Sequence, residues 1–322
     1  MTPARLCGRE LGARLRERDT AAAAAVLNLL ESRSPVAREE ARELLSMLAP
    51  GALDGESPAH IVGVTGPPGV GKSSLLSRLI AHWRAAGGSV AVLAVDPSSR
   101  RSGGSLLGDR ARIEIDPADP GVFVRSTAAG ERVGGLAPAT RAAAGSLAVS
   151  FDVVVIETVG VGQSETEVAD VVDTVAVVVQ PGAGDVLQYL KAGIMEIPDV
   201  LAVTKADLGR LAARTTADVR AALGALGRGD VAVLAVSSIA PPSGIDELVD
   251  ALESHRASID LPAHRLRARR RQALADFAEE YGQSGLRALG GRREAALWLA
   301  DQDPQLDASV LADLLAERAA RS

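Results

Sequence analysis

Apolar and polar positions divide the chain into three stretches with different periodicity. Over residues 1–50 the apolar side chains recur at helical spacing, which predicts an N-terminal helical segment. From His60 to Arg256, short apolar runs alternate with amphipathic segments. Beyond Pro262 this alternation stops, and the pattern predicts a long basic helix over Ala263–Tyr281, a glycine-rich break and two short helices. The middle stretch is therefore expected to hold a sheet between two helical ends.

The middle stretch predicts strands and helices in alternation. Its strand candidates are short, apolar and mostly β-branched: Ile61–Thr65, Val90–Val95, Val122–Arg125, Asp152–Ile156, Thr174–Val179, Val200–Thr204 and Val231–Val236. Helix candidates lie between them: Ser74–Ala86, Ala137–Ala148, Asp185–Met195, Leu211–Leu223 and Gly244–Arg256. Val168–Val172 fits either a helix end or a strand. This alternation predicts an α/β fold with a mainly parallel sheet flanked by helices on both faces.

The first strand candidate runs into Gly66-x-x-x-x-Gly71-Lys72-Ser73, and a helix candidate follows. This order is typical of a P-loop, in which backbone N–H groups and the positive end of the helix dipole face phosphate oxygens. Lys72 is expected to reach the β- and γ-phosphates, and the Ser73 hydroxyl to ligate Mg²⁺. A plain Gly/Pro turn is the alternative. The predicted nucleotide-binding residues here are Gly66, Pro67, Pro68, Gly69, Val70, Gly71, Lys72, Ser73 and Ser74.

Residues 50–58 are rich in glycine, proline and acidic residues, which is typical of a linker. We therefore expect an N-terminal helical segment over residues 1–50, a P-loop domain over 51–258 and a C-terminal helical extension over 259–322. Within the first segment, Ser34 is a candidate N-cap for a helix that begins at Pro35.

Two acidic residues follow the second strand candidate. Asp96 ends that strand, and open α/β sheets bind ligands at the carboxyl ends of their strands, so Asp96 is a candidate catalytic residue and Mg²⁺ ligand. Capping the turn at Pro97 is its alternative role. The Gly/Ser-rich loop Arg100–Asp109 is a candidate switch over the nucleotide. Asp109 is either a second carboxylate near the metal or a turn residue.

A further acid-x-x-Gly string, Glu157-x-x-Gly160, follows the strand candidate Asp152–Ile156. Many P-loop enzymes place such a string here, with the acid near Mg²⁺ and the glycine N–H on the γ-phosphate. Glutamate is one methylene longer than the usual aspartate, so Glu157 could reach a metal-bound water rather than the ion. Gln163 is a candidate for orienting the attacking water, and a polar surface residue is the alternative.

Thr204-Lys205-Ala206-Asp207 matches the guanine-reading pattern [N/T]-K-x-D. The Asp207 carboxylate can accept hydrogen bonds from the N1–H and the amino group of guanine, whereas adenine would leave a buried carboxylate unpaired. Lys205 is expected to pack on the base and brace the P-loop. Thr204 replaces the commoner asparagine and offers fewer hydrogen bonds, from which we expect a modest affinity. After the last strand, backbone N–H groups are placed to contact the guanine oxygen, from Ser237, Ser238 and Ile239.

These motifs resemble those of the P-loop GTPases that chaperone cobalamin-dependent acyl-CoA mutases, the MeaB/ArgK-like proteins. The strings that carry the resemblance span Gly63–Asp207 in unbroken order: GVTGPPGVGKSS, AVLAVDPSSRRSGGSLLGDR, ETVGVGQSETEVAD, QPGAGDVLQYLKAGIMEIPD and TKAD. The strings ETVGVGQSE and PGAGD are far more specific than the P-loop itself.

The resemblance implies that Asp96, Asp109 and Glu157 belong to a Mg²⁺ and hydrolysis site. It implies homodimers formed through the C-terminal helical extension, and slow hydrolysis of GTP to GDP that the mutase stimulates. That cycle would gate adenosylcobalamin loading and the removal of inactivated cofactor, and so protect or reactivate the mutase. The loop Gln180–Lys191 would be a third switch that signals to the mutase, with the candidate residues Gln180, Gly182, Gly184, Asp185 and Lys191.

Composition narrows the remaining choices. Of 322 residues 47% are hydrophobic, and the net charge of −6 gives no electrostatic footprint for nucleic acid. The single cysteine, Cys7, excludes an internal disulfide framework and a multi-thiolate metal site. No apolar run reaches the length of a membrane span, and acidic residues interrupt the arginine-rich N-terminus, so we expect a cytoplasmic protein without a transit peptide. The sequence also lacks Asp-x-His-x-x-Gly, so we expect cobalamin to be involved only through the partner mutase.

Other functions remain open at this point. A nickel-delivery GTPase would be expected to carry a Cys/His cluster, which one cysteine and four scattered histidines do not favour. A kinase or ATPase linked to basic amino-acid transport is disfavoured by Asp207. A nucleotide-dependent binding module without hydrolysis is the non-enzymatic alternative. The basic helix candidate is either a dimer or partner face or a nucleic-acid arm, and the acidic chain favours the former.

Overall fold

The computed structural model describes residues 7–49, 59–96, 113–128, 136–158, 164–182 and 197–321. The chain forms two compact units, each assembled from more than one stretch. Unit 1 comprises residues 1–58, 141–150 and 260–322, and unit 2 comprises residues 59–140 and 151–259. The segments that we expected as separate N-terminal and C-terminal helical parts both lie in unit 1, together with a short piece from the middle of the chain.

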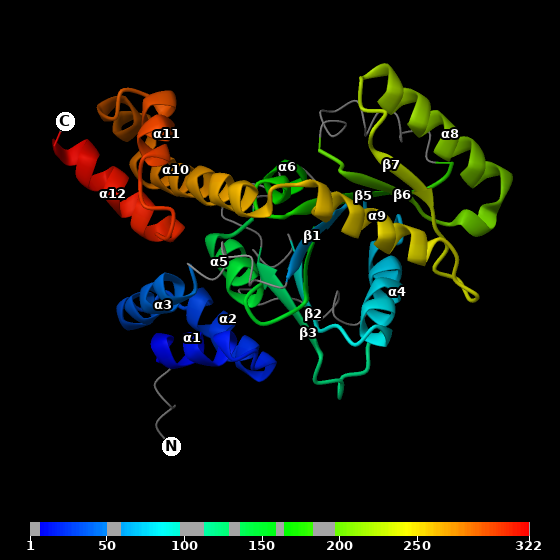
Figure 1. Cartoon of the computed structure of the whole chain (residues 1–322), viewed down its shortest axis with the longest axis horizontal. Coiled ribbons are helices and arrows are strands. Elements are labelled where there is room, and N and C mark those ends of the chain that lie inside the picture. Colours follow the sequence, from blue (N-terminus) through cyan, green and yellow to red (C-terminus); the bar gives the residue numbers. More distant parts are fainter. Residues whose placement is uncertain are drawn as a thin grey trace. The chain divides into compact units, whose positions relative to one another are not determined.

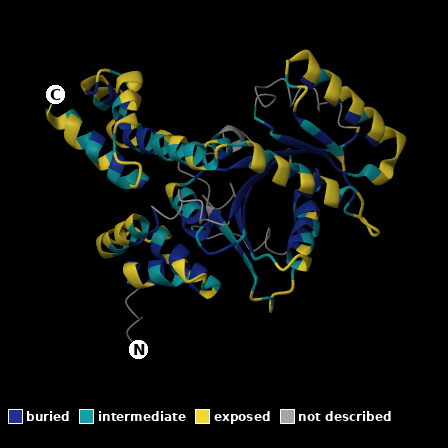
Figure 2. Ribbon diagram, viewed as in Figure 1, coloured by how far each residue is buried: buried dark blue, intermediate teal, exposed yellow. Residues whose placement is uncertain are grey.

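Unit 2 is built on a parallel sheet of seven strands with the order β3-β2-β4-β1-β5-β6-β7 (Figure 1). The strands are β1 (His60–Thr65), β2 (Val90–Asp96), β3 (Val122–Ala128), β4 (Val153–Thr158), β5 (Thr174–Val179), β6 (Val200–Val203) and β7 (Ala232–Ala235). Runs of valine, alanine and isoleucine form these strands because both faces of the sheet are covered, and every residue of β1, β4, β5 and β6 is buried (Figure 2). The predicted fold class is confirmed.

Helices cover both faces of this sheet. On one face, α4 (Lys72–Ala85) and α9 (Ile245–Ser258) share an apolar core with alternate residues of the strands (Figure 1). On the other face, α6 (Ser164–Ala169) lies against Gly63, where an added Cβ would stand 2.8 Å from Val168. The helix α8 (Arg210–Ala225) follows the short 3₁₀ turn η5 (Ala206–Leu208), and its Arg220 donates to Val233 O of β7.

The predicted elements differ from the observed ones mainly at their ends. β3 runs to Ala128 rather than Arg125, because it pairs with β2 along its whole length. The ambiguous stretch Val168–Val172 contains the end of α6 and a turn, not a strand. The predicted helix Asp185–Met195 lies outside the described residues.

Unit 1 is helical. Its elements are α1 (Gly8–Arg16), η1 (Thr20–Ala22), α2 (Ala23–Glu31), α3 (Pro35–Leu48), α10 (Leu261–Ala288), α11 (Arg292–Ala300), α12 (Ala308–Arg321) and the part of α5 (Pro138–Leu147) that begins at Arg141. The predicted N-cap is confirmed, since Ser34 Oγ accepts from Ala37 N at 3.1 Å. Helices α1 to α3 enclose one apolar core and α10 to α12 another. The two ends of the chain meet where Ser46 Oγ donates to Asp307 Oδ2 and Arg269 donates to Ala49 O.

The basic helix predicted over Ala263–Tyr281 is the first part of α10, and the predicted break at Gly282 is observed as a kink. Gly282, at φ 61°, interrupts the helical backbone, but the helix resumes and runs to Ala288. Two of its arginines serve unit 1 itself: Arg269 donates to Pro304 O, Leu306 O and Ala49 O, and Arg270 donates to Ala300 O and Gln302 O. Burial lowers the pKa of Arg269 to about 10, so the side chain stays charged at neutral pH. None of the described helices is long and apolar enough to cross a membrane.

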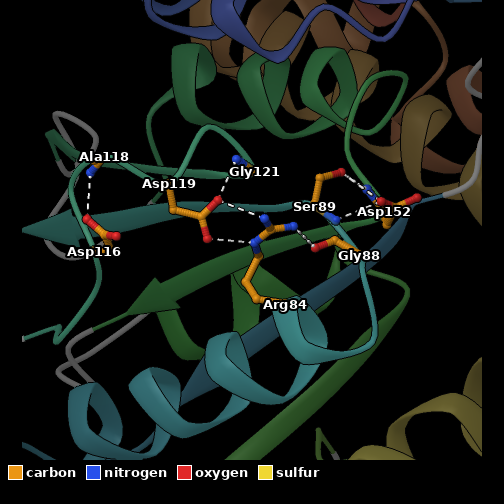
Figure 3. A network of polar contacts seen from close by, with 8 residues as sticks. All are labelled: Arg84, Gly88, Ser89, Asp116, Ala118, Asp119, Gly121 and Asp152. Carbon is orange, nitrogen blue, oxygen red and sulfur yellow. Dashed lines mark hydrogen bonds and ion pairs between the residues drawn. The ribbon is translucent and has the colours of Figure 1, made fainter.

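The amino-terminal edge of the unit 2 sheet is closed by a polar network (Figure 3). Arg84 grips Asp119 with two hydrogen bonds of 2.7 and 2.8 Å and donates to Gly88 O at 2.7 Å. Asp152 accepts from both the N–H and the hydroxyl of Ser89 at 2.7 Å. The Arg84 guanidinium holds the pKa of Asp119 below its usual range. These bonds join the segments that lead into β2, β3 and β4.

Candidate nucleotide-binding site

The predicted P-loop lies at the carboxyl end of β1, in the centre of the sheet. Three of its glycines have positive φ, with values of 150° at Gly66, 77° at Gly69 and 97° at Gly71, the residue before α4. At Gly66 an added Cβ would stand 2.1 Å from Val178 O of the neighbouring strand β5. The loop therefore needs glycine there for two reasons, the backbone angle and the close approach of another strand.

Lys72 is the first residue of α4, and its side chain is 7% exposed. Its ammonium donates to Gly66 O at 2.6 Å and to Pro67 O at 3.0 Å, so it folds back over the start of the loop. The positive charge thus lies next to the N-terminus of α4, whose backbone N–H groups and dipole also favour an anion. A cation beside a helix N-terminus suits an anionic ligand such as phosphate.

A hydroxyl and a carboxylate converge beside the P-loop. β4 pairs with β1, and Glu157 lies opposite Val64 in the register. Ser73 Oγ donates to Glu157 Oε1 at 3.1 Å, and Glu157 is 7% exposed. Hydroxyl and carboxylate oxygens are the hard donors that Mg²⁺ prefers, so this pair fits the ion predicted for the site. Glu157 reaches the predicted metal-binding hydroxyl directly.

The other predicted metal and hydrolysis residues are placed less fully. Asp96 is the last residue of β2, next to β4, so its backbone lies at the same sheet edge as Glu157. The residues Asp109, Gly160 and Gln163 lie outside the described part of the chain. Among the described residues there is no group of three or more His, Cys, Asp or Glu side chains that could hold a metal ion.

Thr204 joins the predicted guanine-reading segment to the P-loop. Its hydroxyl is buried and lies 2.6 Å from Val70 O in the loop and 3.0 Å from Val179 O at the end of β5. We expected Lys205 to brace the P-loop, and in the structure the Thr204 hydroxyl also contacts that loop. Lys205, with a left-handed φ of 56°, donates to Gln180 Oε1. The threonine therefore supplies a bracing contact that we had expected to be weakened by the absence of asparagine.

The predicted guanine contacts come together at Asp207. Ser237 Oγ donates to Asp207 Oδ1 at 2.8 Å, and Ile239 N donates to Ser237 Oγ at 3.3 Å. Ala206 N also donates to Val236 O, which fixes the two segments side by side. The structure thus brings together residues that are thirty positions apart in the sequence, at an edge shared with the P-loop.

Two of the predicted third-switch residues are described. Gln180 directly follows β5 and accepts from Lys205, and Gly182 has a φ of 77°. Gly184, Asp185 and Lys191 lie outside the described residues. One contact near the site was not predicted: Arg78 of α4 donates through Nε to Ser238 O at 2.9 Å. The only sequence signal for it is a basic residue near the middle of the P-loop helix.

Comparison with known proteins decides the family. The family model described as "Methylmalonyl Co-A mutase-associated GTPase MeaB" matches residues 23–287. The chain belongs to the MeaB family of GTPases. A protein of Pyrococcus abyssi named as a candidate GTPase is 41% identical to this MeaB-family chain over 296 residues, covering 89% of this chain and 87% of the relative.

Similar proteins also occur in a bacterium and in an animal. A probable GTPase of Mycobacterium tuberculosis is 40% identical over 274 residues, covering 83% of this chain and 80% of the relative. The mitochondrial methylmalonic aciduria type A homolog of Caenorhabditis elegans is 40% identical over 199 residues, which is 58% of this chain and 49% of that one. A solved structure named as an LAO/AO transport system kinase is 27% identical, with a TM-score of 0.66 and 98% of both chains covered. The resemblance seen in the sequence is thus confirmed, and the MeaB-family chain is a P-loop GTPase.

Proposed function

We propose that this MeaB-family GTPase binds Mg²⁺ and GTP at the carboxyl edge of its sheet, hydrolyses GTP to GDP, and acts as a chaperone of a cobalamin-dependent acyl-CoA mutase of the methylmalonyl type. The observation that carries the proposal is the placement of Lys72, the Ser73–Glu157 pair and the Ser237–Asp207 pair along one sheet edge. One end of that edge suits phosphates and the other suits guanine.

The proposed roles follow from these contacts. Lys72 and the N–H groups of the loop bind and neutralise the β- and γ-phosphates, which favours departure of GDP. When bound, Mg²⁺ would be held by Ser73 with Glu157 and Asp96, and it would offset charge on the phosphate oxygens. Gln163 is our candidate for orienting the attacking water, and Asp109 and Gly160 keep their predicted roles near the metal and the γ-phosphate.

Specificity for guanine rests on Asp207. One oxygen of its carboxylate accepts a hydrogen bond from Ser237, and this bond orients the carboxylate. An adenine base would leave that acceptor without the two donors that guanine supplies. This argues against an ATP-dependent kinase linked to basic amino-acid transport, although one similar structure carries such a name. The absence of a His, Cys and acid cluster among the described residues gives no support to a metallochaperone.

The partner and assembly are also part of the proposal. The family description, which names methylmalonyl-CoA mutase, supports an acyl-CoA mutase as the client. We propose that cobalamin is bound by that client and not by this chain. We propose Gln180–Lys191 as the segment that signals to it. We further propose a homodimer through residues 259–322, where Tyr281 and Leu297 are large apolar side chains that are 43% and 55% exposed. A cytoplasmic location remains our prediction, and we propose neither nucleic acid nor a membrane as a partner.

The test is GTP turnover by the purified protein, alone and with methylmalonyl-CoA mutase from the same organism, with the Lys72→Ala variant as control. We expect slow turnover that rises clearly when mutase is added, and turnover at least about tenfold lower in the variant, because a lost charge-assisted contact costs about 1.5–3 kcal/mol. Turnover that ignores the mutase would contradict the client assignment, and equal turnover by the variant would contradict the P-loop assignment. Light scattering on the same sample checks for the dimer.

A further inference from the structure

Arg78 is a charged residue near the nucleotide site that none of the motifs contains. It lies on α4, six positions after Lys72, and is half-buried. Its Nε donates to Ser238 O at 2.9 Å, across 160 positions of sequence. Ser238 belongs to the loop that we propose to contact guanine. The arginine therefore joins the helix that begins at the P-loop to the loop beside Asp207.

The loop that contains Ser238 is fixed at its base by other contacts. Ser237 and Ser243 exchange two backbone hydrogen bonds of 2.9 and 3.1 Å. At Gly244, with a φ of 73°, an added Cβ would stand 2.3 Å from Ala235 O, so the returning chain is pressed against β7. These contacts define where the loop begins and ends. They leave the peptide between Ser238 and Ile239 to be oriented by other groups.

That peptide is held from both sides. Its carbonyl, Ser238 O, accepts from Arg78, and its N–H, at Ile239, donates to Ser237 Oγ at 3.3 Å. The C=O and N–H of a trans peptide point in opposite directions. By holding the carbonyl toward α4, Arg78 therefore turns the N–H toward Ser237. The Ser237 hydroxyl in turn donates a hydrogen bond to the Asp207 carboxylate. The Ile239 side chain is 63% exposed, so side-chain burial does not fix this peptide.

We propose that Arg78 is a positioning residue for guanine recognition, holding the Ser238–Ile239 peptide in the orientation that faces the base-reading carboxylate. The inference rests on the proposed function, since it takes guanine as the base bound at Asp207. In this role the arginine acts through the loop backbone, by its bond to Ser238 O. It makes the affinity for the base depend on the helix that holds the phosphates.

The test compares two ligands on the full chain, GDP and inorganic pyrophosphate, by calorimetry with Mg²⁺ present. Arg78→Met keeps the side-chain length and removes the donor. We expect Kd for GDP to rise about tenfold, equivalent to about 1.4 kcal/mol, and Kd for pyrophosphate to change less than about twofold. A stopped-flow measurement should show faster GDP release. These results would separate a role in base binding from a general loss of fold.

The matched control is Arg220→Met, which removes another arginine-to-carbonyl bond of unit 2, from Arg220 to Val233 O at 2.6 Å. We expect the control to bind both ligands as the wild type does. Arg78→Lys, which restores a cationic donor, should recover part of the GDP affinity. If Arg78→Met does not fold, the affinities of Arg78→Lys for GDP and pyrophosphate still test the proposal.

Two results would overturn the inference: unchanged GDP binding in Arg78→Met, or a parallel loss of GDP and pyrophosphate binding. The second would mean that Arg78 acts through the P-loop. Failure of the proposed function looks different, because the wild type would then bind ADP as tightly as GDP, or would not bind pyrophosphate.

Discussion

The two edges of the unit 2 sheet are both rich in polar side chains, but they use them differently. At the amino edge, side chains pair with one another and with nearby loop groups, as Arg84 does with Asp119 (Figure 3). The carboxyl edge also has side-chain pairs, Ser73–Glu157 and Ser237–Asp207, but there other side chains donate to carbonyls of the binding loops. Lys72 donates to Gly66 O and Pro67 O, Thr204 to Val70 O, and Arg78 to Ser238 O.

The difference shows how one sheet can have one end for stability and one for binding. A carboxylate that accepts two hydrogen bonds from one guanidinium has both of its oxygens engaged inside the protein. A side chain that holds a loop carbonyl instead fixes the shape of a backbone, and the N–H groups of that backbone remain to face a ligand. We therefore expect substitutions at the carboxyl edge to change nucleotide binding, and those at the amino edge to change stability alone.

The largest contrast is expected from glycine substitutions at the two edges. In Gly66→Ala the new methyl meets the backbone carbonyl of Val178, which cannot move aside, at a positive φ. We expect a loss of about 2–4 kcal/mol in the free energy of unfolding, together with loss of GDP binding. In Gly121→Ala the methyl meets the Arg84 guanidinium at 2.3 Å, which can swing away. We expect a loss of about 1 kcal/mol there, with GDP binding intact.

Urea unfolding and calorimetry measure both quantities on each variant. The proposed difference between the two edges would be contradicted if both substitutions lowered the free energy of unfolding equally. It would also be contradicted if Gly121→Ala weakened GDP binding as much as Gly66→Ala does.

A smaller effect, on selectivity rather than on folding, is expected from Asp207→Asn. Asparagine offers an amide donor that suits the 2-oxo group of xanthine, so preference should shift from GTP toward xanthosine triphosphate by about tenfold. Competition binding measures the ratio. The exposed carboxylate of Asp246, which contacts His82, provides the control, and Asp246→Asn should keep the wild-type ratio. Persistence of the GTP preference in Asp207→Asn would remove the guanine-reading role.

The smallest effect is expected at the amino edge, from Asp119→Asn. The pKa of Asp119 is lowered chiefly by its hydrogen bonds with Arg84, so its contribution to stability is present above the unfolded pKa and is lost as pH falls through the folded pKa. The melting temperature of the wild type should exceed that of the variant at pH 7, by a small margin because the ion pair is partly accessible to solvent. The margin should begin to narrow near pH 4, the usual range of an unfolded aspartate, and close only once pH is below the lowered pKa of the folded state.

Differential scanning calorimetry across this pH range checks the direction of the trend. GDP affinity at pH 7 should be the same for both proteins. A margin that widens in acid, or a weaker affinity in the variant, would show that the amino edge is not the separate structural end described above.

The sequence predicted those parts of the site whose spacing is set by one backbone segment. Gly66, Lys72 and Ser73 share a single loop and helix, and Asp207 follows Lys205 within a fixed turn. The relative positions of these residues can therefore be predicted from their spacing in the sequence. Short apolar runs likewise predicted all seven strands. Strand ends were less certain, since pairing with a neighbour extends β3 beyond its apolar run.

Contacts made across the fold were not predictable in this way. Arg78 to Ser238 O depends on how α4 lies against the last loop, and no local pattern encodes that. The bond from Thr204 to the P-loop depends on how β5 and β6 bring the two segments together. The shared membership of the two chain ends in unit 1 was missed for the same reason, because each end reads as an independent helical segment.

The interleaving of the units sets the order in which this protein can be completed during synthesis. The N-terminal helices leave the ribosome first, whereas the rest of unit 1 is the short piece 141–150 and the long stretch that begins at residue 260. At about 5–20 residues per second, the chain between residues 49 and 260 takes roughly 10–40 seconds to make. Until then Ala49 O has no Arg269 to bind, and α1 to α3 rely on their own apolar cluster. The sheet of unit 2 is thus synthesised before residues 260–322, which complete unit 1.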